Sequence, residues 1–326
     1  MESILVAGGA GYVGSHACKA LALAGYRPVT LDNLLTGHAD AVKWGPLVQA
    51  DIADIEAVRR TVREHGVTSV MHFAARSLVG ESVVKPELYY ENNVTGTLRF
   101  LDALTAEGLK HIVFSSTAAV YGEAEGDLLA EDLPLKPINP YGETKLAIER
   151  ALGWIGPAKG FSWCALRYFN AAGADADGEI GERHDPETHL IPNLVRATLG
   201  TAPGLKVFGS DYPTHDGFAV RDYIHVADLA DAHVKALEWL KGGGASRAFN
   251  LGTGKGLSVM EMINAAERAL GRKPPFEITG RRPGDPPRLV ADPAAAMASF
   301  GWTPTRSDAD TLVASVAAFE AAQARR

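Results

Sequence analysis

The sequence Val6-Ala7-Gly8-Gly9-Ala10-Gly11-Tyr12-Val13-Gly14 follows a short apolar run and precedes a stretch with helical spacing. It contains Gly9-x-Gly11-x-x-Gly14, the dinucleotide fingerprint, between a predicted strand and a predicted helix. One glycine allows a tight turn, the next lets the backbone approach a pyrophosphate, and the last lets helix and strand pack closely. The free N–H groups at the start of the helix favour phosphate. The stretch therefore predicts the first β–α unit of a dinucleotide-binding fold.

An acidic residue follows this fingerprint at the expected distance. Asp32 ends the next apolar run, about twenty residues on, where a carboxylate binds the ribose hydroxyls of a dinucleotide. The residues after it are Asn33 and Leu34 rather than an arginine, which favours NAD over NADP. A plain strand–turn–helix without a ligand is the alternative, and the paired glycines and acid disfavour it.

Length and composition describe an ordinary globular protein. The chain has 326 residues, which suits two domains better than one. Hydrophobic residues make up 46% and charged residues 22% of it. The net charge of -7 argues against nucleic acid as a partner, because that would require a basic face. A few well-placed arginines can still bind an anionic small molecule.

The two cysteines, Cys18 and Cys164, lie in apolar surroundings and are expected to be buried thiols without metal or disulfide spacing. No apolar run approaches membrane-spanning length, and the chain enters a predicted strand directly after Met1-Glu2-Ser3. We therefore expect a cytoplasmic protein without a signal peptide and without a membrane partner.

Strand and helix patterns alternate through the first half of the chain. Predicted strands cover residues 47–51, 69–74, 111–115 and 163–169, and predicted helices cover 55–65, 86–107 and 139–155. Near-continuous apolar strands that alternate with helices indicate a parallel sheet covered on both faces. The fold class is therefore α/β, a Rossmann-type doubly wound parallel sheet.

Beyond Asn170 the sequence becomes rich in Gly, Asp and Pro. Helices are predicted at 191–199, within 222–241, at 258–270 and at 311–324, with a strand at 248–251. Ser258 and Glu261 form a capping-box pattern. We expect an NAD-binding domain over residues 1–170, rejoined by about 218–253, and a smaller mixed α/β substrate domain within 171–326.

Two stretches carry candidate catalytic groups. Ser115-Ser116-Thr117 ends a predicted strand, and ligands of parallel sheets lie beyond strand carboxyl ends. Tyr141 and Lys145 are four residues apart on a predicted helix, hence on one face. A free tyrosine has a pKa of about 10 and is a poor base. A neighbouring ammonium and a bound nicotinamide cation both favour the phenolate, so downstream of the fingerprint the pair indicates a general base.

With these residues in place, the chain resembles the extended short-chain dehydrogenase/reductase family, in particular its 4-epimerases of UDP-glucose and UDP-galactose. The resemblance runs over essentially the whole length. It is carried by residues 8–16, 31–34, 79–82, 89–93, 167–170 and 220–226.

The resemblance implies a redox-neutral cycle on tightly held NAD. Tyr141 would take the proton of the sugar 4-hydroxyl while the C4 hydride passes to NAD. The 4-keto sugar would then turn over and receive the hydride on its other face. Lys145 would tune Tyr141 and hold the nicotinamide ribose, and Thr117 would bridge Tyr141 and the sugar oxygen.

The resemblance also implies a set of cofactor-binding residues that includes Tyr141 and Lys145. The others are Gly8, Gly11, Tyr12, Val13, Gly14, Asp32, Asn33, Asp51, Ile52, Phe73, Ala74, Ala75, Ser77, Asn92, Ser115 and Tyr168. One position departs from the family pattern, because Ser77 stands where relatives often carry a lysine that touches the cofactor. A serine hydroxyl can still donate to phosphate, and Arg76 could supply the charge or be a surface residue.

A second set is implied for the substrate. It comprises Thr117, Tyr141, Phe169, Asn170, Leu190, Phe208, Arg221, Arg282, Asp285 and Leu289. Arg221 and Arg282 suit a diphosphate through forked, permanently charged hydrogen bonding, and Asp285 would take the uridine ribose hydroxyls. Leu289 would line the wall near the sugar 2-substituent. Its intermediate size predicts good activity on UDP-glucose and UDP-galactose and weak activity on N-acetylated forms.

The histidines show no metal-ligand spacing, so no metal is predicted. His72 and His225 are expected in core strands, and His189, which replaces a family asparagine, is assigned no role. The resemblance further implies a homodimer built from the helices at about 86–107 and 141–155.

Alternative functions share the fold. Sugar-nucleotide 4,6-dehydratases carry Asp-Glu after the strand-end threonine, whereas this chain has Ala118-Ala119, so elimination would lack its acid and base. The related decarboxylases are disfavoured for the same reason. A simple alcohol dehydrogenase is disfavoured because it would leave Arg221 and Arg282 without a role. A non-catalytic NAD sensor typically lacks Tyr or Lys of the pair. The 4-epimerases of other UDP-sugars, including UDP-N-acetylglucosamine, UDP-xylose and UDP-glucuronate, remain open.

Overall fold

The fingerprint forms a tight turn between strand β1 (Ser3–Ala7) and helix α1 (Tyr12–Leu23) in the computed structural model, which describes residues 1–124, 126–282 and 286–325. Gly8 has a φ of +80°, and a Cβ there would lie 2.5 Å from the backbone N of Ala74. A Cβ on Gly14 would lie 2.1 Å from the carbonyl oxygen of Gly8. Glycine is therefore required at both positions, once for the turn and once for close helix–strand packing.

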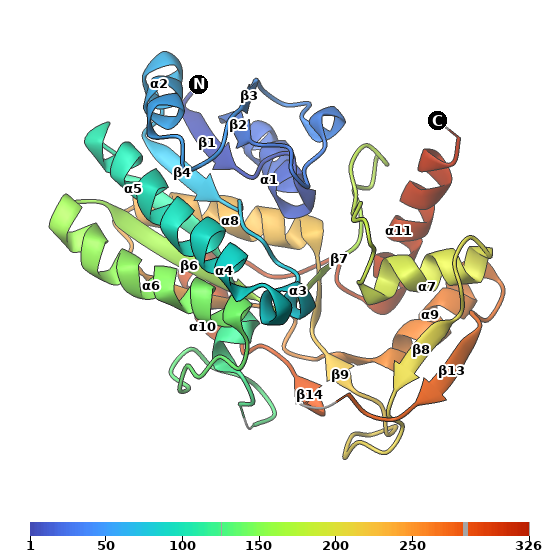
Figure 1. The fold of residues 1–326 in the computed structure, drawn as a ribbon. Helices are drawn as coiled ribbons and strands as arrows, with labels where there is room; N and C mark the ends of the chain where they lie inside the picture. The colour runs from blue at the N-terminus through green and yellow to red at the C-terminus, as the bar shows by residue number, and fades with distance from the viewer. Residues whose placement is uncertain (125, 283–285, 326) are drawn as a thin grey trace.

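Seven parallel strands form the main sheet in the order β11-β6-β5-β4-β1-β2-β3 (Figure 1). Besides β1, these strands are β2 (Arg27–Asp32), β3 (Leu47–Gln49), β4 (Ser69–His72), β5 (His111–Thr117), β6 (Ser162–Tyr168) and β11 (Arg247–Leu251). The chain runs outward from β1 to β3 and then returns to place β4 on the other side of β1. Ligands of doubly wound sheets bind at the carboxyl ends beside such a reversal.

Helices cover both faces of the sheet, which confirms the predicted doubly wound α/β class. One face packs against α2 (Ile55–His65), α5 (Thr97–Ala106) and α6 (Pro140–Lys159). The other packs against α1, α8 (Val226–Lys241) and α10 (Ala294–Phe300). Successive residues of β1 alternate between these two cores, with Leu5 in the first and Ile4 in the second, both fully buried. Full burial of such side chains stabilises by about 1.5–3 kcal/mol each.

The predicted helix at 86–107 is interrupted in the structure. It consists of α4 (Pro86–Tyr89), a π-helical segment η2 (Tyr90–Gly96) and α5, and it follows a short helix α3 (Val79–Val84) that the sequence analysis did not predict. Two 3₁₀ turns, η1 (Ala39–Ala41) and η3 (Ala118–Tyr121), also follow strand ends. π-Helical turns are rare and often lie at functional sites.

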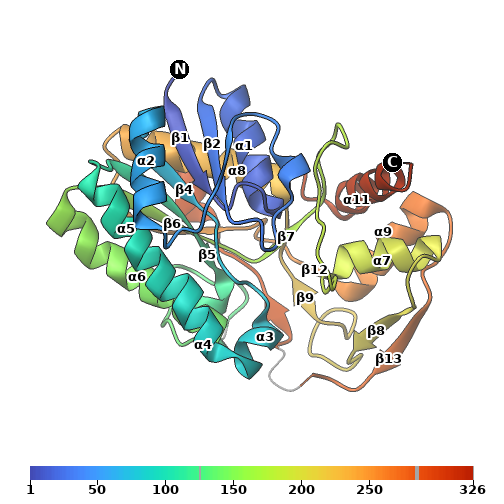
Figure 2. The same cartoon turned by 45° about the horizontal axis from the view of Figure 1, so that its top comes forward.

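The second half of the chain builds a smaller layer beside the sheet (Figure 2). Helices α7 (Leu190–Leu199), α9 (Val259–Leu270) and α11 (Ala309–Gln323) share one apolar core. Strands β8 (Leu205–Phe208) and β13 (Phe276–Thr279) pair in parallel at its edge. Ser258 and Glu261 make the predicted capping box at the start of α9.

Short strands join this layer to the main sheet. β7 (Asn170–Ala172) pairs with β10 (Tyr223–His225), and β9 (Val220–Arg221) lies between β12 (Leu257–Ser258) and β14 (Arg288–Leu289). The sequence analysis predicted helices and one strand, at 248–251, beyond Asn170, and none of these short strands. Two- and three-residue strands carry too few side chains for a period-2 pattern to show.

Cys18 and Cys164 are buried free thiols, and His72 and His225 lie buried in strands, as predicted. Among the described residues, no helix is both long and apolar enough to cross a membrane.

Candidate active site

The carboxyl end of β5 carries three hydroxyl-bearing residues. The Ser115 hydroxyl is 2.6 Å from the phenol oxygen of Tyr168, at the end of the neighbouring strand β6. The Thr117 hydroxyl accepts a hydrogen bond from Ala119 N at 3.2 Å, and it acts on the phenol of Tyr141 by lowering its pKa. The strand therefore ends in a polar patch that contacts the predicted general base.

Helix α6 supplies that base and its lysine. Pro140 occupies the first turn, and the Asn139 side chain caps the helix by accepting from Gly142 N at 2.9 Å. This start places Tyr141 and Lys145 one turn apart on the face toward β5. Lys145 Nζ donates to the Ser115 carbonyl oxygen at 2.7 Å and lies 6.0 Å from the centre of the Tyr141 ring. The structure thus brings together Ser115, Thr117, Tyr141, Lys145 and Tyr168.

Burial dominates the electrostatics of this group. It lowers the pKa of Lys145 to about 7, because desolvation disfavours the ammonium. Burial raises the pKa of Tyr141 above its ordinary value, and the hydrogen bond with Thr117 offsets only part of that rise. The sequence argument expected the lysine to lower the pKa of the phenol, whereas in the protein alone burial raises that pKa and Thr117 is the group that lowers it.

We call the group of Ser115, Thr117, Tyr141, Lys145 and Tyr168 the reaction end. A buried ion pair that sequence reasoning missed lies beside it. Glu149 lies one turn beyond Lys145 on α6 and pairs with Arg167 of β6, with Arg167 Nη2 2.6 Å from Glu149 Oε2. Ser116 donates to the same carboxylate, and Arg167 donates to the Tyr121 hydroxyl at 2.9 Å. The partners are distant in sequence, and the only local signal was a glutamate on the buried face of α6.

The cofactor end combines the glycine turn with acids at neighbouring strand ends. Asp32, at the end of β2, accepts from Ala10 N at 3.0 Å and Leu34 N at 2.8 Å. Asn33 donates to Asp51, beyond β3, at 2.8 Å. The turn lacks Cβ atoms where a pyrophosphate would approach, and carboxylates stand beside it where ribose hydroxyls would lie. These residues fit a dinucleotide.

The other predicted cofactor residues flank this turn. Tyr12 and Val13 open α1, and Ile52 is buried after β3. Phe73, Ala74 and Ala75 follow β4, and the backbone N–H groups of Phe73 and Ala74 both donate to the Ala7 carbonyl.

Ser77 and Arg76, the two candidates to replace the family lysine, lie in different surroundings. Ser77 is exposed, whereas Arg76 forms an ion pair with Glu81 at 3.5 Å. Asn92 lies in the π-helical segment and donates to Asn93, whose side chain binds the backbone of Arg76. The arginine is therefore held in place by its backbone and its charge is already paired.

A cavity of about 570 Å³ lies beyond β7, between α7, β8 and β9. Five of the predicted substrate residues line it: Asn170, Leu190, Phe208, Arg221 and Arg282. The Arg282 guanidinium stacks 3.8 Å from the centre of the Phe208 ring. The volume of the cavity lies in the range of small-molecule sites, and the guanidinium groups of Arg221 and Arg282 suit an anion.

The other predicted substrate residues lie elsewhere. Phe169 and Leu289 pack against the apolar cluster of Val120, Tyr121, Leu129 and Leu146, beside the reaction end. Asp285 lies outside the described residues. The reaction end and the cavity are adjacent along the chain. Tyr168 contacts Ser115 at the reaction end, and Asn170, two residues later, lines the cavity.

The loop before α7 contains residues that sequence reasoning passed over. His189, to which no role was assigned, lines the cavity together with Glu182. His184 and Glu187 lie beside them. These residues belong to no helix or strand pattern in the sequence, so they were expected only to lie in a loop.

Comparison with known proteins agrees with this geometry. Residues 4–252 match the model of the NAD dependent epimerase/dehydratase family. The UDP-glucose 4-epimerase of Rhizobium leguminosarum bv. trifolii is 51% identical over 93% of this chain and 93% of its own length.

Solved structures are similar over nearly the whole chain. The Brucella ovis UDP-glucose 4-epimerase in complex with NAD is 48% identical, with a TM-score of 0.95 over 97% of this chain and 98% of that one. The Stenotrophomonas maltophila enzyme, with bound NAD and formylated UDP-arabinopyranose, is 40% identical, with a TM-score of 0.96 over 100% of this chain and 99% of that one.

The fold and site define an NAD-dependent enzyme of the nucleotide-sugar type. The chain belongs to the NAD dependent epimerase/dehydratase family and, within it, to the UDP-glucose 4-epimerases.

Proposed function

We propose that the chain interconverts UDP-glucose and UDP-galactose by oxidation at sugar C4, rotation of the 4-keto sugar and return of the hydride to its other face. The observation that carries the proposal is the group of Thr117, Tyr141 and buried Lys145 at the carboxyl end of β5. The glycine turn suited to a dinucleotide follows β1 at the same carboxyl edge of the sheet, and the cavity with two arginines begins at Asn170, two residues beyond Tyr168.

In this mechanism, Tyr141 accepts the proton of the sugar 4-hydroxyl and later returns it. Thr117 passes a hydrogen bond between that phenol and the sugar oxygen. Lys145 holds the nicotinamide ribose and places its charge one helical turn from the phenol. Bound NAD supplies a hydride acceptor and, when oxidised, a positive charge that offsets the effect of burial on the phenol.

The cofactor-binding roles rest on the residues around the turn. Asp32 and Asn33 would bind the adenosine ribose, and the N–H groups of the turn would bind the pyrophosphate, with Gly8, Gly11 and Gly14 giving it access. Ser115 and Tyr168 would border the nicotinamide. Contacts to the rest of the cofactor are proposed for Tyr12, Val13, Asp51, Ile52, Phe73, Ala74, Ala75, Ser77 and Asn92.

The substrate roles rest on the cavity. Arg221 and Arg282 would bind the diphosphate, with Asn170, Leu190 and Phe208 around the nucleotide. Phe169 and Leu289 would border the sugar, and Asp285 would take the uridine ribose.

The domain division is proposed on the same basis. Residues 1–170 would bind NAD, with 218–253 rejoining them, and this is supported by β11 pairing with β6 and α8 packing over the sheet. The remainder of 171–326 would bind the UDP-sugar.

A homodimer is proposed through the outer helices. α5 and α6 lie side by side at one edge of the molecule (Figure 1), and exposed apolar side chains occur along this face, including Tyr90, Leu98 and Trp154. Trp154 is 83% exposed, so a partner helix would remove a large apolar surface from water. Light scattering of the parent and of Trp154→Glu tests the dimer.

The competing functions do not fit the residues of this site. Ala118 and Ala119 form the 3₁₀ turn after β5 where a dehydratase needs an acid and a base. A sensor would not need the buried lysine, which desolvation makes costly. A comparison of turnover rates distinguishes epimerisation of UDP-galactose from that of other UDP-sugars. The size of Leu289 predicts faster turnover of UDP-galactose than of UDP-N-acetylgalactosamine.

The direct test is incubation of the purified protein with UDP-galactose and no added NAD. Formation of UDP-glucose supports the proposal. Activity that requires added, freely exchanging NAD argues against a retained cofactor, and absence of any interconversion overturns the proposed function.

A further inference from the structure

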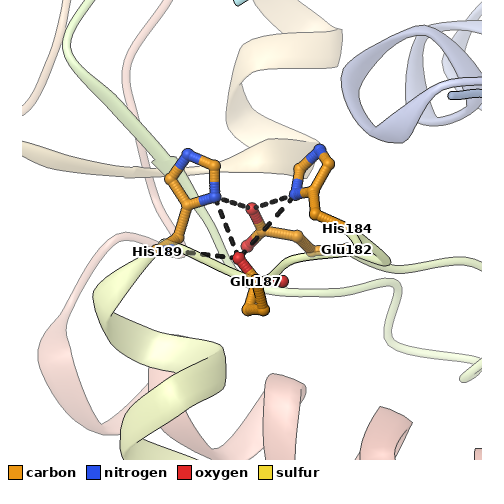
Figure 3. A group of neighbouring side chains, drawn as sticks. All are labelled: Glu182, His184, Glu187 and His189. Carbon is orange, nitrogen blue, oxygen red and sulfur yellow. Dashed lines mark hydrogen bonds and ion pairs between the residues drawn. The ribbon is translucent and has the colours of Figure 1, made fainter. Parts of the chain in front are cut away.

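Four side chains converge on the loop between β7 and α7, in the pattern Glu182-x-His184-x-x-Glu187-x-His189. Figure 3 shows both imidazole rings and both carboxylates directed toward a common point. His184 Nδ1 lies 3.1 Å from Glu182 Oε1 and 3.8 Å from Glu187 Oε1. His189 Nδ1 lies 2.7 Å and 3.1 Å from the same two oxygens. Each residue contributes one candidate ligand atom, and all four atoms lie within 4.8 Å of one another.

The two carboxylates are buried and only partly satisfied. The side chains of Glu182 and Glu187 are 3% and 4% exposed. Glu187 Oε1 accepts from the backbone N–H groups of Thr188 and His189, both at 2.9 Å. Within the described part of the chain, the second oxygens of both carboxylates, Glu182 Oε2 and Glu187 Oε2, make no hydrogen bond despite being buried. Two adjacent buried carboxylates require positive charge between them.

The spacing suits a small tetrahedral cation. Zinc binds histidine nitrogen and carboxylate oxygen at about 2.0–2.2 Å, so neighbouring ligand atoms of a tetrahedral site are about 3.3 Å apart. The four nitrogen–oxygen distances, from 2.7 to 3.8 Å, bracket that value. Two imidazoles among the ligands disfavour Ca²⁺ and Mg²⁺, which prefer oxygen. The two carboxylates would balance the charge of a divalent ion.

A second acidic cluster nearby provides the contrast. Asp175, Asp177 and Glu179 also converge, but Lys19 Nζ lies between them at 2.8, 2.6 and 3.4 Å. That cluster obtains its cation from the protein itself. The Glu182–His189 cluster has only titratable imidazoles for the same purpose, because His184 and His189 are the sole cations that lie against both carboxylates in the described residues.

We propose that Glu182, His184, Glu187 and His189 bind one Zn²⁺ ion. Four protein ligands would complete the tetrahedron, which defines a structural site rather than one that activates water. The site lies beyond the proposed function, since no step of the epimerisation uses it. Protons on the two histidines are the alternative occupants, and the experiment distinguishes them.

The position of the site indicates what zinc would do. His189 is the residue that precedes α7, and Thr188, His189 and Leu190 line the substrate cavity. His184 contacts Tyr12 edge to face, with ring centres 6.5 Å apart, and Tyr12 opens α1. Zinc would therefore fix the cavity wall against the helix that follows the glycine turn. Its removal should raise the KM for the UDP-sugar more than it changes kcat.

The test measures metal content before activity. The holoenzyme is treated with a chelator, dialysed, incubated with excess ZnCl₂, freed of unbound metal and assayed for zinc by mass spectrometry. We expect one zinc per chain, a Tm several degrees above that of the stripped protein, and, with CoCl₂ in place of ZnCl₂, the intense visible absorption of tetrahedral cobalt. The double variant His184→Gln/His189→Gln should lose all three, whereas His215→Gln, at a histidine 56% exposed elsewhere, should keep them.

Circular dichroism and retained NAD show whether the double variant folds. No zinc uptake by the parent, or equal zinc in the parent and the folded double variant, overturns the proposal. If the double variant does not fold, Glu187→Gln replaces it and is read by the same metal assay. Because the readout is metal content, the result is independent of whether the enzyme epimerises UDP-galactose.

Discussion

The reaction end and the substrate cavity of this molecule are built in different ways. The reaction end takes its residues from β5, α6 and β6, and its functional groups are fixed by strand ends and one helical turn. The cavity takes its residues from β7, α7, β8, β9 and, at Arg282, the segment that follows β13. Its groups are more exposed and come from separate segments. Buried regular elements therefore fix the chemistry, while loops and short strands fix recognition.

The largest effect is expected where the chemistry is fixed. Tyr141→Phe removes the phenol whose pKa Thr117 lowers, and with it the proposed proton acceptor. Loss of a positioned general base should lower kcat for UDP-galactose by about 10²–10⁴-fold, while NAD stays bound. Steady-state rates and the nucleotide content of the purified variant measure both.

Tyr26→Phe, at the far end of the sheet beside Lys241, is the matched control and should keep the parent rate. Equal rates for Tyr141→Phe and the parent would remove this tyrosine from the mechanism.

The next effect tests whether the reaction end depends on its buried support. Glu149→Gln leaves Arg167 buried without its counter-charge, since both side chains are 5% exposed. Breaking one partner of such a pair costs about 3–5 kcal/mol in the free energy of unfolding. Chemical denaturation measures it.

Asp310→Asn breaks an exposed pair with Arg268 and serves as the control. A surface pair contributes little, so its midpoint should stay close to that of the parent. A Glu149→Gln midpoint equally close to the parent would show that the network contributes nothing to stability.

A smaller effect is expected at the cavity. Arg282→Ala removes a guanidinium that stacks on Phe208 and faces the cavity. Losing a charge-assisted hydrogen bond to a diphosphate should raise the KM for UDP-galactose by about tenfold or more and leave kcat nearly unchanged. A fall in kcat without a change in KM would place this arginine with the chemistry and erase the contrast between the two ends.

The last effect is a pH dependence of stability at the reaction end. The pKa of Lys145 is lowered to about 7 in the folded chain by burial, against about 10.4 when unfolded. Below pH 7 the amine is charged in both states and its full burial cost is present. Between pH 7 and 10.4 unfolding takes up a proton, so this cost falls by up to about 1.4 kcal/mol per pH unit as the pH rises.

Lys145→Met should therefore stabilise the protein relative to the parent most below pH 7, and this gain should shrink toward pH 10. Denaturation of both proteins at several pH values measures the difference. A difference that is independent of pH would mean that the lysine is not desolvated in the folded protein.

Much of this architecture was predictable from local pattern. The strand–turn–helix of the fingerprint, the alternating strands and Tyr141 with Lys145 depend on spacing within single elements. The cavity depended on family likeness, because Asn170, Phe208 and Arg221 share no local pattern and meet only through tertiary packing. The Glu149–Arg167 pair and the Glu182–His189 cluster were missed, since neither a lone buried charge nor a loop histidine predicts its partners.

The burial of Tyr141 was also beyond the sequence. The four-residue spacing gave the lysine its place on the helix but not the desolvation that raises the pKa of the phenol. Electrostatics at a site follow from what surrounds it on all sides, and only the packed chain supplies that.

The central claim is that one chain removes a hydride from sugar C4 and returns it to the same carbon of the same molecule. A crossover experiment tests it directly, with UDP-[4-²H]galactose mixed with uniformly ¹³C-labelled UDP-galactose and no added NAD. The account predicts that mass spectrometry of the UDP-glucose product finds deuterium only in the molecules without ¹³C. Deuterium distributed between both isotopic forms would contradict it.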